Sequence, residues 1–391
     1  MINSQYFLLL KTGQAEIRGY KELHEQHKEL ITPIVEITRG RKNHKKTFER
    51  TGVEYNFSAI EKFIKDHCTS GGKFFVDITK AESLSSLKTK ELRDHAEGYK
   101  KWVTYFSSLK HEHINAFPIM QINPPEDQDP EDYISDVCGQ FDSLSEISKC
   151  IGYRAFPKID SSFDYDLYIL KERIESYVAN GGIFYVILDY DYIRPGTGDL
   201  YSLEVVKVLD VIHELVSCVT PVLISTSFPS SVTDIGDMGH GEFSEEETVL
   251  HSAVSKLAHN KFNVLYGDYG SIHPIRNDDV IAANGWRPRI DYPFGGERIF
   301  YYREGRQYTG KGPEKIYTTT YSHHYAMVAQ SVSKDRRFLA DQNAQDENSW
   351  GVKQILEAAK RRVPGASPSF WISVRFNIHI QQQLRRLSLY P

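Results

Sequence analysis

The chain has 391 residues, of which 40% are hydrophobic and 12% aromatic, so it is long enough to bury a large apolar core. Its 47 lysines and arginines nearly balance 52 aspartates and glutamates, and the net charge of −5 excludes a general attraction to nucleic acid or to acidic membranes. The sequence lacks an apolar run of about 18 residues and any CxxC pair, so we expect a cytoplasmic protein with no membrane segment, disulfide framework or zinc knuckle.

Eight short apolar runs, rich in β-branched and aromatic residues, predict buried strands. These runs are residues 6–11, 32–37, 73–78, 116–122, 150–155, 183–189, 221–226 and 262–268. Segments with helical periodicity lie between them, at residues 15–30, 57–68, 94–110, 130–149, 163–180, 201–216 and 244–260. The chain therefore alternates strand and helix until the eighth strand.

This alternation favours an α/β fold in which parallel strands are joined by right-handed crossovers. Eight units close into a (β/α)8 TIM-like barrel more naturally than they form an open sheet. A doubly wound sheet is the alternative, but it would normally bring a glycine-rich first turn. Residues 11–16 lack the spacing of that dinucleotide-binding fingerprint.

The pattern changes after Gly270 to an aromatic segment rich in glycine and arginine. Helical segments follow at residues 323–341, 350–362 and 371–387. We therefore predict a barrel over residues 1–272 and an appended, mostly helical region over residues 273–391. Because Trp286, Trp350 and Trp371 need apolar partners, this region is expected to pack on the barrel.

Polar residues end the eight predicted strands, and the residue two positions before each of them is mostly apolar or small. The terminal residues are Lys11, Glu36, Asp77, Gln121, Arg154, Asp189, Thr226 and Asp268. Because side chains alternate along a strand, each pair shares a face, which predicts an apolar barrel interior capped by polar groups at the C-terminal rim. Barrel enzymes hold their chemistry at this rim.

Lys11, Glu36, Asp77, Asp189 and Asp268 are the candidate catalytic residues. Barrel closure should place Lys11 between Glu36 and Asp268, where it would act as an electrostatic clamp rather than as a Schiff-base nucleophile. The four carboxylates need a compensating cation, and Mg²⁺ or Mn²⁺ with these oxygen ligands, or a basic ligand, would supply it. An ion-pair network without chemistry is the alternative.

Candidate substrate-binding residues surround this rim. Arg154, Gln121 and Thr226 come from the strand ends, and Arg39 and Arg41 begin a basic loop after the second strand, a position suited to phosphates or a nucleic-acid backbone. The glycine-rich residues 236–241 after the seventh strand could present backbone amides to phosphate, although such a weak motif is more often a plain flexible loop.

The chain also resembles the beta protein family of bacteriophages and bacteria. The resemblance rests on short matches in the same order, among them residues 31–37 (ITPIVEI), 75–77 (FVD), 187–189 (ILD), 267–269 (GDY), 298–305 (RIFYYREG) and 377–380 (NIHI). It implies a modified (β/α) barrel, recurring polar positions at Lys11, Glu36, Asp77, Asp189 and Asp268, and a role in phage–host conflict. Arg298, which opens one match, joins the candidate substrate-binding residues.

Two functions from different classes follow. The first is a metal-assisted nucleotide or nucleic-acid phosphodiesterase in phage defence, with the carboxylates as metal ligands or acid–base groups and with Lys11 and Arg154 holding phosphate oxygens. The second is a non-catalytic sensor or scaffold that binds a phage molecule and regulates a partner effector protein. A glycoside hydrolase using two rim carboxylates ranks third.

Overall fold

The computed structural model describes residues 6–52, 54–69, 73–258, 261–275, 286–310, 316–346 and 348–390. Eight parallel strands form one sheet in the order β6-β5-β2-β1-β11-β9-β8-β7. They are β1 (Tyr6–Leu10), β2 (Ile31–Ile37), β5 (Phe74–Ile78), β6 (Ala116–Pro118), β7 (Cys150–Ala155), β8 (Ile183–Tyr192), β9 (Thr220–Thr226) and β11 (Leu265–Asp268). All eight predicted strands are present.

The two edges of this sheet meet, so the sheet is nearly closed as a barrel. Ile119, just beyond β6, forms a parallel bridge with Gly152 of β7, and the Met120 N–H donates to the Gly152 carbonyl over 2.8 Å. A Cβ at Gly152 would lie 3.1 Å from the Ile119 side chain and 3.3 Å from the Phe75 ring. Because Gly152 has no side chain, Ile119 and Phe75 can pack against its backbone where the two edges of the sheet meet. The predicted barrel is confirmed.

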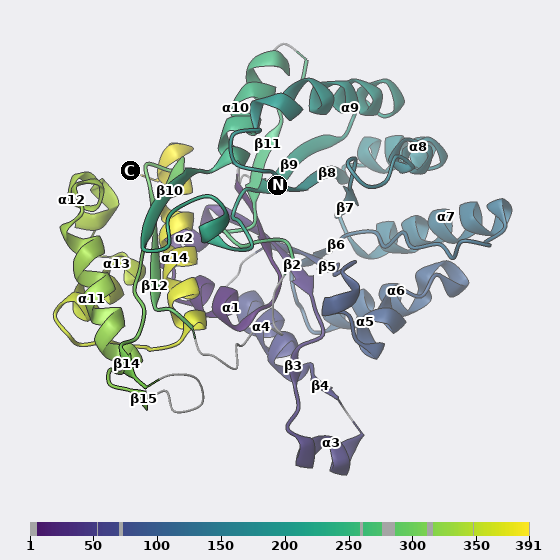
Figure 1. The fold of residues 1–391 in the computed structure, drawn as a ribbon. Helices are drawn as coiled ribbons and strands as arrows, with labels where there is room; N and C mark the ends of the chain where they lie inside the picture. Colours follow the sequence, from purple (N-terminus) through teal and green to yellow (C-terminus); the bar gives the residue numbers. More distant parts are fainter. Residues whose placement is uncertain are drawn as a thin grey trace.

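Helices surround the sheet (Figure 1). They are α1 (Gln14–Lys21), α2 (Glu25–Glu29), α4 (Ser58–Thr69), α5 (Leu87–Leu92), α6 (Ala96–His111), α7 (Pro130–Ile147), α8 (Phe163–Ala179), α9 (Ser202–Leu215) and α10 (Glu246–Ala258). Because both faces of the strands are buried, the strands are continuous apolar runs. Phe7, Ile34 and Ile187 fill the interior, whereas Leu8, Val35 and Leu188 pack under the helices.

The basic loop after β2 is a small structured excursion. It contains β3 (Arg41–Lys42), α3 (Lys45–Thr51) and β4 (Tyr55–Asn56), and β3 pairs with β4. Figure 1 shows α3 projecting away from the barrel. No buried side chain anchors α3, so its lysines lie on a solvated helix.

The C-terminal region combines helices with a small sheet that the sequence did not predict. Its helices are α11 (Tyr321–Lys334), α12 (Arg336–Ala340), α13 (Trp350–Ala359) and α14 (Pro368–Arg386). The antiparallel sheet has the order β10-β13-β12, with β10 (His240–Ser244), β12 (Arg289–Phe294) and β13 (Arg298–Arg303). A hairpin of β14 (Tyr308–Thr309) and β15 (Ile316–Tyr317) follows.

Helix α14 lies between the barrel and the rest of the C-terminal region (Figure 1). Phe376, Ile380 and Leu384 join the core beneath the barrel helices, whereas Val374 and Ile378 join a second core with β12 and α11. Gly19 of α1 permits this contact, because a Cβ there would lie 2.7 Å from a carbonyl oxygen of α14. The region thus packs on the barrel through one shared helix. The boundary at residue 272 stays a prediction.

Within the part of the chain that the structure describes, no helix combines the length and the apolar character needed to cross a lipid bilayer.

Candidate functional site

Seven of the eight strand-end residues share the face of the apolar barrel interior. Leu9, Ile34, Phe75 and Ile187 belong to the interior core, and the positions two residues further along the chain are polar. By this alternation the inward-facing residues are Lys11, Glu36, Asp77, Gln121, Arg154, Asp189 and Thr226. All seven are at most 6% exposed. The predicted polar cap of the barrel interior is therefore present.

Arg154 is the centre of this cap. Its Nη1 lies 2.6 Å from Glu36 Oε2 and 2.8 Å from Asp77 Oδ2, and its Nη2 lies 2.5 Å from Asp189 Oδ2. The Phe156 ring lies over the guanidinium, with its centroid 4.8 Å from Cζ. One arginine therefore compensates carboxylates from three other strands.

Three further residues complete the arrangement. Lys11 Nζ lies 3.5 Å from Glu36 Oε1 and 5.3 Å from the centre of the Tyr269 ring. The Tyr269 hydroxyl donates to Asp189 at 2.7 Å, and Gln121 Nε2 donates to Asp77 at 2.8 Å. We name the whole set the rim network: Lys11, Glu36, Asp77, Gln121, Arg154, Asp189 and Tyr269.

The electrostatics of the rim network keep its central pair ionised. Burial alone would raise the pKa of Glu36, but Lys11 and Arg154 outweigh it and lower that pKa to about 2. Burial would lower the pKa of Arg154, yet Asp189 and Glu36 hold it well above its usual value. A general acid or base needs a pKa near the working pH, so Glu36 is poorly tuned for proton transfer.

Asp268 does not join the rim network. It shares the outer face of β11 with Tyr266, and it accepts hydrogen bonds from the hydroxyls of Tyr6 at 2.9 Å and Tyr266 at 2.8 Å. The inward position at this strand end belongs to Tyr269 instead. Lys11 therefore does not lie between Glu36 and Asp268 as expected. A shift of one residue reverses the face of a side chain, and the doubly buried strand gave no alternation from which to choose.

Asp268 belongs to a second buried group on the outside of the barrel. His379 of α14 places Nε2 2.9 Å from Asp268 Oδ2 and Nδ1 2.6 Å from Glu245 Oε1. Glu247 accepts hydrogen bonds from the backbone N–H and the hydroxyl of Ser227, at 2.9 and 2.5 Å. We name Ser227, Glu245, Glu247, Asp268 and His379 the seam cluster, because they lie where α14 meets the barrel.

Charge in the seam cluster is shared between an imidazole and carboxylates. Burial opposes ionisation of His379, but Glu245 and Asp268 raise its pKa well above the usual value. Burial, followed by the charges of Glu245 and Asp268, raises the pKa of Glu247 to about 8. All four side chains are at most 2% exposed, so these ionic contacts lie inside the protein, between α14 and the barrel. The sequence predicts a helix over residues 244–260 and shows a family match at residues 377–380, but no pattern relates the two segments.

The remaining predicted site residues lie apart from Arg154 or outside the described side chains. Arg39 Cζ lies 5.1 Å from the Tyr55 ring centre, in the excursion after β2. Arg298 pairs with Glu242 across the small sheet, and its side chain is half exposed. The Thr226 hydroxyl accepts from the Phe228 N–H at 3.2 Å. The side chain of Arg41 lies outside the described residues.

The glycine-rich residues 236–241 pack against Tyr301 and lead into β10. The Tyr301 hydroxyl donates to the Asp237 carbonyl at 2.6 Å, and β10 begins at His240. A Cβ at Gly236 or Gly241 would lie within 2.8 Å of Tyr301 side-chain atoms. These glycines therefore make room for a tyrosine.

The rim carboxylates, as arranged, do not form a metal site. Glu36, Asp77 and Asp189 each direct an oxygen at the Arg154 guanidinium, which takes the place that a divalent ion would need. Across the described residues, no group of three or more His, Cys, Asp or Glu side chains is arranged to hold a metal ion. Mg²⁺ or Mn²⁺ could bind these oxygens only if Arg154 moved away from them.

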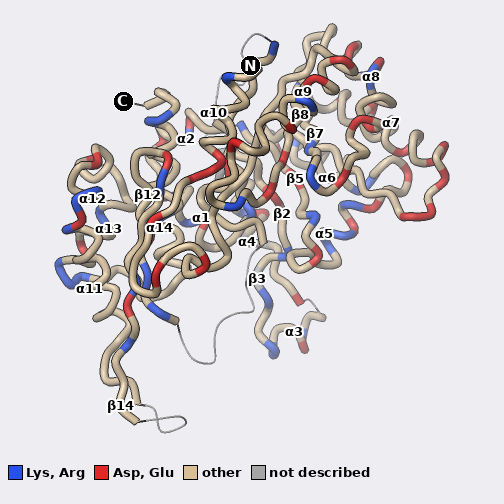
Figure 2. Tube along the Cα trace, turned by 45° about the horizontal axis from the view of Figure 1, so that its top comes forward, with Lys and Arg blue, Asp and Glu red and all other residues tan. Residues whose placement is uncertain are grey.

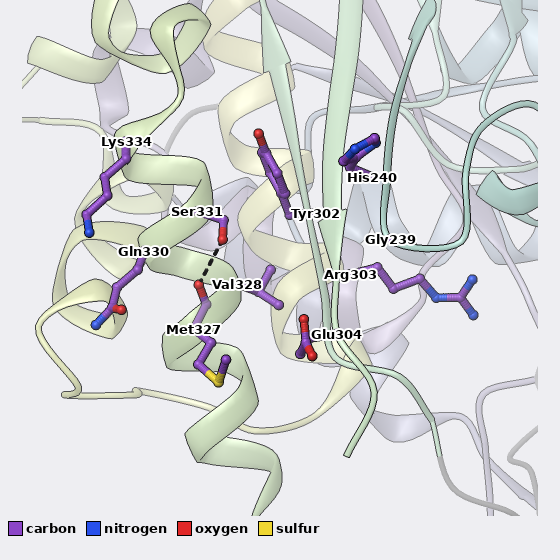
Figure 3. Close-up of a pocket in the computed structure, with 10 residues that line it drawn as sticks. All are labelled: Gly239, His240, Tyr302, Arg303, Glu304, Met327, Val328, Gln330, Ser331 and Lys334. Atoms are coloured by element: carbon purple, nitrogen blue, oxygen red, sulfur yellow. Dashed lines mark hydrogen bonds between the residues drawn. The ribbon is translucent and has the colours of Figure 1, made fainter. Parts of the chain in front are cut away.

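A surface groove of about 440 Å³ lies on the small sheet, between β13 and α11 (Figure 3). Its lining includes His240, Tyr302, Arg303 and Lys334 and none of the rim network. The groove is therefore separate from the candidate site at the strand ends of the barrel.

Comparison with known proteins gives one consistent relationship. A family model described as Beta protein matches residues 6–385. Protein beta of Enterobacteria phage P4 is 26% identical over 388 residues, covering 98% of this chain and 93% of the phage protein.

Two solved structures share only a loose likeness. The catalytic domain of a mannanase from Streptomyces sp. SirexAA-E has a TM-score of 0.36 and 9% identity, and the match covers 67% of this chain and 73% of the mannanase chain. A putative α-L-fucosidase from Bacteroides thetaiotaomicron has a TM-score of 0.39 and 10% identity, covering 70% and 87%. Neither likeness carries a functional argument.

Proposed function

The chain belongs to the Beta protein family, and from that premise we propose that its rim network is a recognition site without turnover, acting in a phage-related process. The phage link comes from the P4 relative. Recognition rather than catalysis is supported by one observation: Arg154 holds three carboxylates at 2.5 to 2.8 Å. Carboxylates held in this way orient an arginine rather than move protons.

The charge of the rim network defines the ligand class. Among the members of the rim network, three carboxylates, Glu36, Asp77 and Asp189, face two cations, Lys11 and Arg154, which leaves one formal negative charge within the set. The charged groups just outside it are Lys80 and Arg93, which interact with Asp77, and Asp191, which interacts with Asp189. A ligand that presents an amine or guanidinium group would complete the balance, because an uncompensated buried charge costs several kcal/mol or so. Phe156 lies over Arg154 and would have to move to admit it.

A pair of opposite charge changes tests this proposal. Glu36→Gln removes the negative excess and should weaken binding of spermidine or arginine amide at least tenfold, whereas Lys11→Met should preserve or strengthen it. Isothermal titration calorimetry measures both. The control is Asp142→Asn on α7, which removes an exposed ion pair with Arg173 of α8. Binding of pyrophosphate that requires Lys11 would contradict a cationic ligand. Binding of no probe would leave an ion-pair network that only stabilises the barrel, and would also contradict the proposal.

The metal-assisted phosphodiesterase is the second candidate, favoured by the proximity of the three carboxylates. It requires Arg154 to leave them. Release of nitrophenol from bis-p-nitrophenyl phosphate in Mn²⁺, lost in Asp77→Asn and Asp189→Asn, would support it against the recognition site. Plating efficiency of phages on cells that express the same variants then shows whether the rim network matters for the phage-related process.

A further inference from the structure

Two arginines lie directly opposite each other in the small sheet. Arg289 of β12 and Arg303 of β13 are Cα partners in the antiparallel ladder. Side chains so paired share a face and lie close together, and like charges in such pairs destabilise a sheet. Asp291 lies 3.0 Å from Arg289, but Arg375 of α14 shares this carboxylate at 2.6 Å. Local compensation is therefore divided among several guanidinium groups.

A third arginine extends the cluster. Arg287 precedes β12, and a Cβ at Gly305, just after β13, would lie 3.9 Å from its Nε. Burial and then the charges of the neighbouring Arg289 and Arg287 lower the pKa of Arg303. Figure 3 shows the Arg303 side chain directed away from α11, so the arginine cluster begins at the edge of the groove that Arg303 helps to line and extends away from α11.

Aromatic rings stack beside these arginines. The Arg306 guanidinium lies between Tyr317 and Tyr321, 4.0 and 4.3 Å from their ring centres. Tyr321 in turn stacks on Trp286, with centroids 4.1 Å apart and an interplanar angle of 7°. A continuous stack of rings and one cation thus leads from the start of β12 to the β14–β15 hairpin.

The outer end of this stack is exposed. Tyr308 is 52% exposed and Tyr317 is 37% exposed. They pair across the β14–β15 hairpin, which extends from the body of the molecule (Figure 2). Their rings contact each other edge to face, with centroids 6.1 Å apart, and each tyrosine keeps more than a third of its surface exposed and open to a ligand.

We propose that Arg287, Arg289, Arg303, Arg306, Tyr308 and Tyr317 form a surface that binds single-stranded nucleic acid. Arginines bind phosphate oxygens through their planar fork, and tyrosine rings stack on bases that only a single strand leaves open. The whole chain carries a charge of −5, so binding must come from such a local cluster. The surface is separate from the rim network, and its test is independent of the proposed function.

Fluorescence anisotropy with a labelled 20-nucleotide oligothymidine tests this surface on the full chain at 50 and 200 mM NaCl. Arg287→Gln with Arg303→Gln should weaken binding at least tenfold and reduce the slope of log K against log salt by about 1.4, as expected for two lost phosphate contacts. Tyr308→Ser with Tyr317→Ser should weaken binding at least fivefold without changing that slope.

A melting temperature and a surface variant distinguish a lost binding surface from an unfolded protein. Arg303→Gln also removes like-charge repulsion, so the melting temperature should hold or rise while binding falls, which a merely unfolded variant cannot imitate. Arg173→Gln, a surface change on α8, should bind like the wild-type protein. Absence of wild-type binding at 50 mM NaCl, wild-type affinity in the arginine variant, or tighter binding of the matching duplex would each overturn the proposal.

Discussion

The rim network and the seam cluster both bury ionisable groups in the same barrel, but they are built in opposite ways. The rim network gathers residues from the ends of adjacent strands around Arg154, at the open end of an apolar interior. The seam cluster joins Glu245, Asp268 and His379, which are distant in the chain, beneath a covering helix. Strand geometry alone creates the first, whereas the second requires the C-terminal region to dock. The rim network therefore depends on the barrel strands, whereas the seam cluster connects α14 to the barrel.

The largest effect should come from Arg154→Met. It leaves Glu36, Asp77 and Asp189 buried without their shared cation. Removing one partner of a buried ion pair lowers the free energy of unfolding by about 3–5 kcal/mol. Urea unfolding should show a loss at the upper end of that range. Arg173→Met on the surface of α8 should cost under about 1 kcal/mol. Equal losses in both variants would mean that the rim network stores no special electrostatic stability.

His379→Ala tests the seam cluster in the same way. It leaves Asp268 and Glu245 buried without the imidazole that they share, so we expect the free energy of unfolding to fall by about 3–4 kcal/mol. Because His379 lies on α14, limited proteolysis should also release the C-terminal region earlier than in the wild-type protein. His240→Ala, whose side chain is 66% exposed, is the matched control. If the release of α14 is unchanged, the cluster does not hold the helix.

The pH dependence of stability separates the two groups further. The pKa of Glu247 is about 8 in the folded protein and near 4.5 when unfolded, so the folded state keeps a proton that the unfolded state has lost between these values. Stability from this group is full below about pH 4.5 and falls as pH rises towards 8.

Ionisation of Glu247 should lower the folding equilibrium constant of the wild-type protein at least about tenfold between pH 5 and pH 8, and Glu247→Gln should remove that decrease. Urea unfolding at pH 5, 6.5 and 8 measures it. Glu112→Gln, a surface change near Lys65, should keep the wild-type dependence. An identical slope in Glu247→Gln would show that Glu247 is already ionised at neutral pH.

The smallest expected effect is that of Gln121→Leu. This change removes the hydrogen bond to Asp77 but leaves the contact of Asp77 with Arg154, so we expect a loss of about 1–2 kcal/mol by urea unfolding. A loss as large as that of Arg154→Met would mean that the amide, rather than the guanidinium, organises the rim network.

The sequence predicted the barrel and most of the rim network because both depend on local patterns. Six strands place an apolar residue, and a seventh places Gly152, two positions before a polar end, and that spacing transfers directly to three dimensions. It failed at the eighth strand, where Gly267 carries no side chain and both Asp268 and Tyr269 are polar enough to end a strand. Tyr269 was missed for that reason.

The seam cluster could not be predicted from spacing. Asp268 and His379 are 111 residues apart, and no periodicity relates α14 to β11. The small sheet was missed because β10 comes from a segment that looked like a glycine-rich loop, and its partner β13 follows more than 50 residues later. Long-range pairing of short strands leaves little local signal.

The contact between α1 and α14 has a consequence for synthesis. Asn377 Nδ2 donates to the Gly19 carbonyl across 358 residues of chain. At roughly 5–20 residues per second, a ribosome needs at least about 18 s between making the two partners. During that interval the nascent barrel exposes the apolar surface that α14 later covers, and β10 is unpaired until β13 has been made. The emerging chain should therefore depend on chaperones until α14 has left the ribosome.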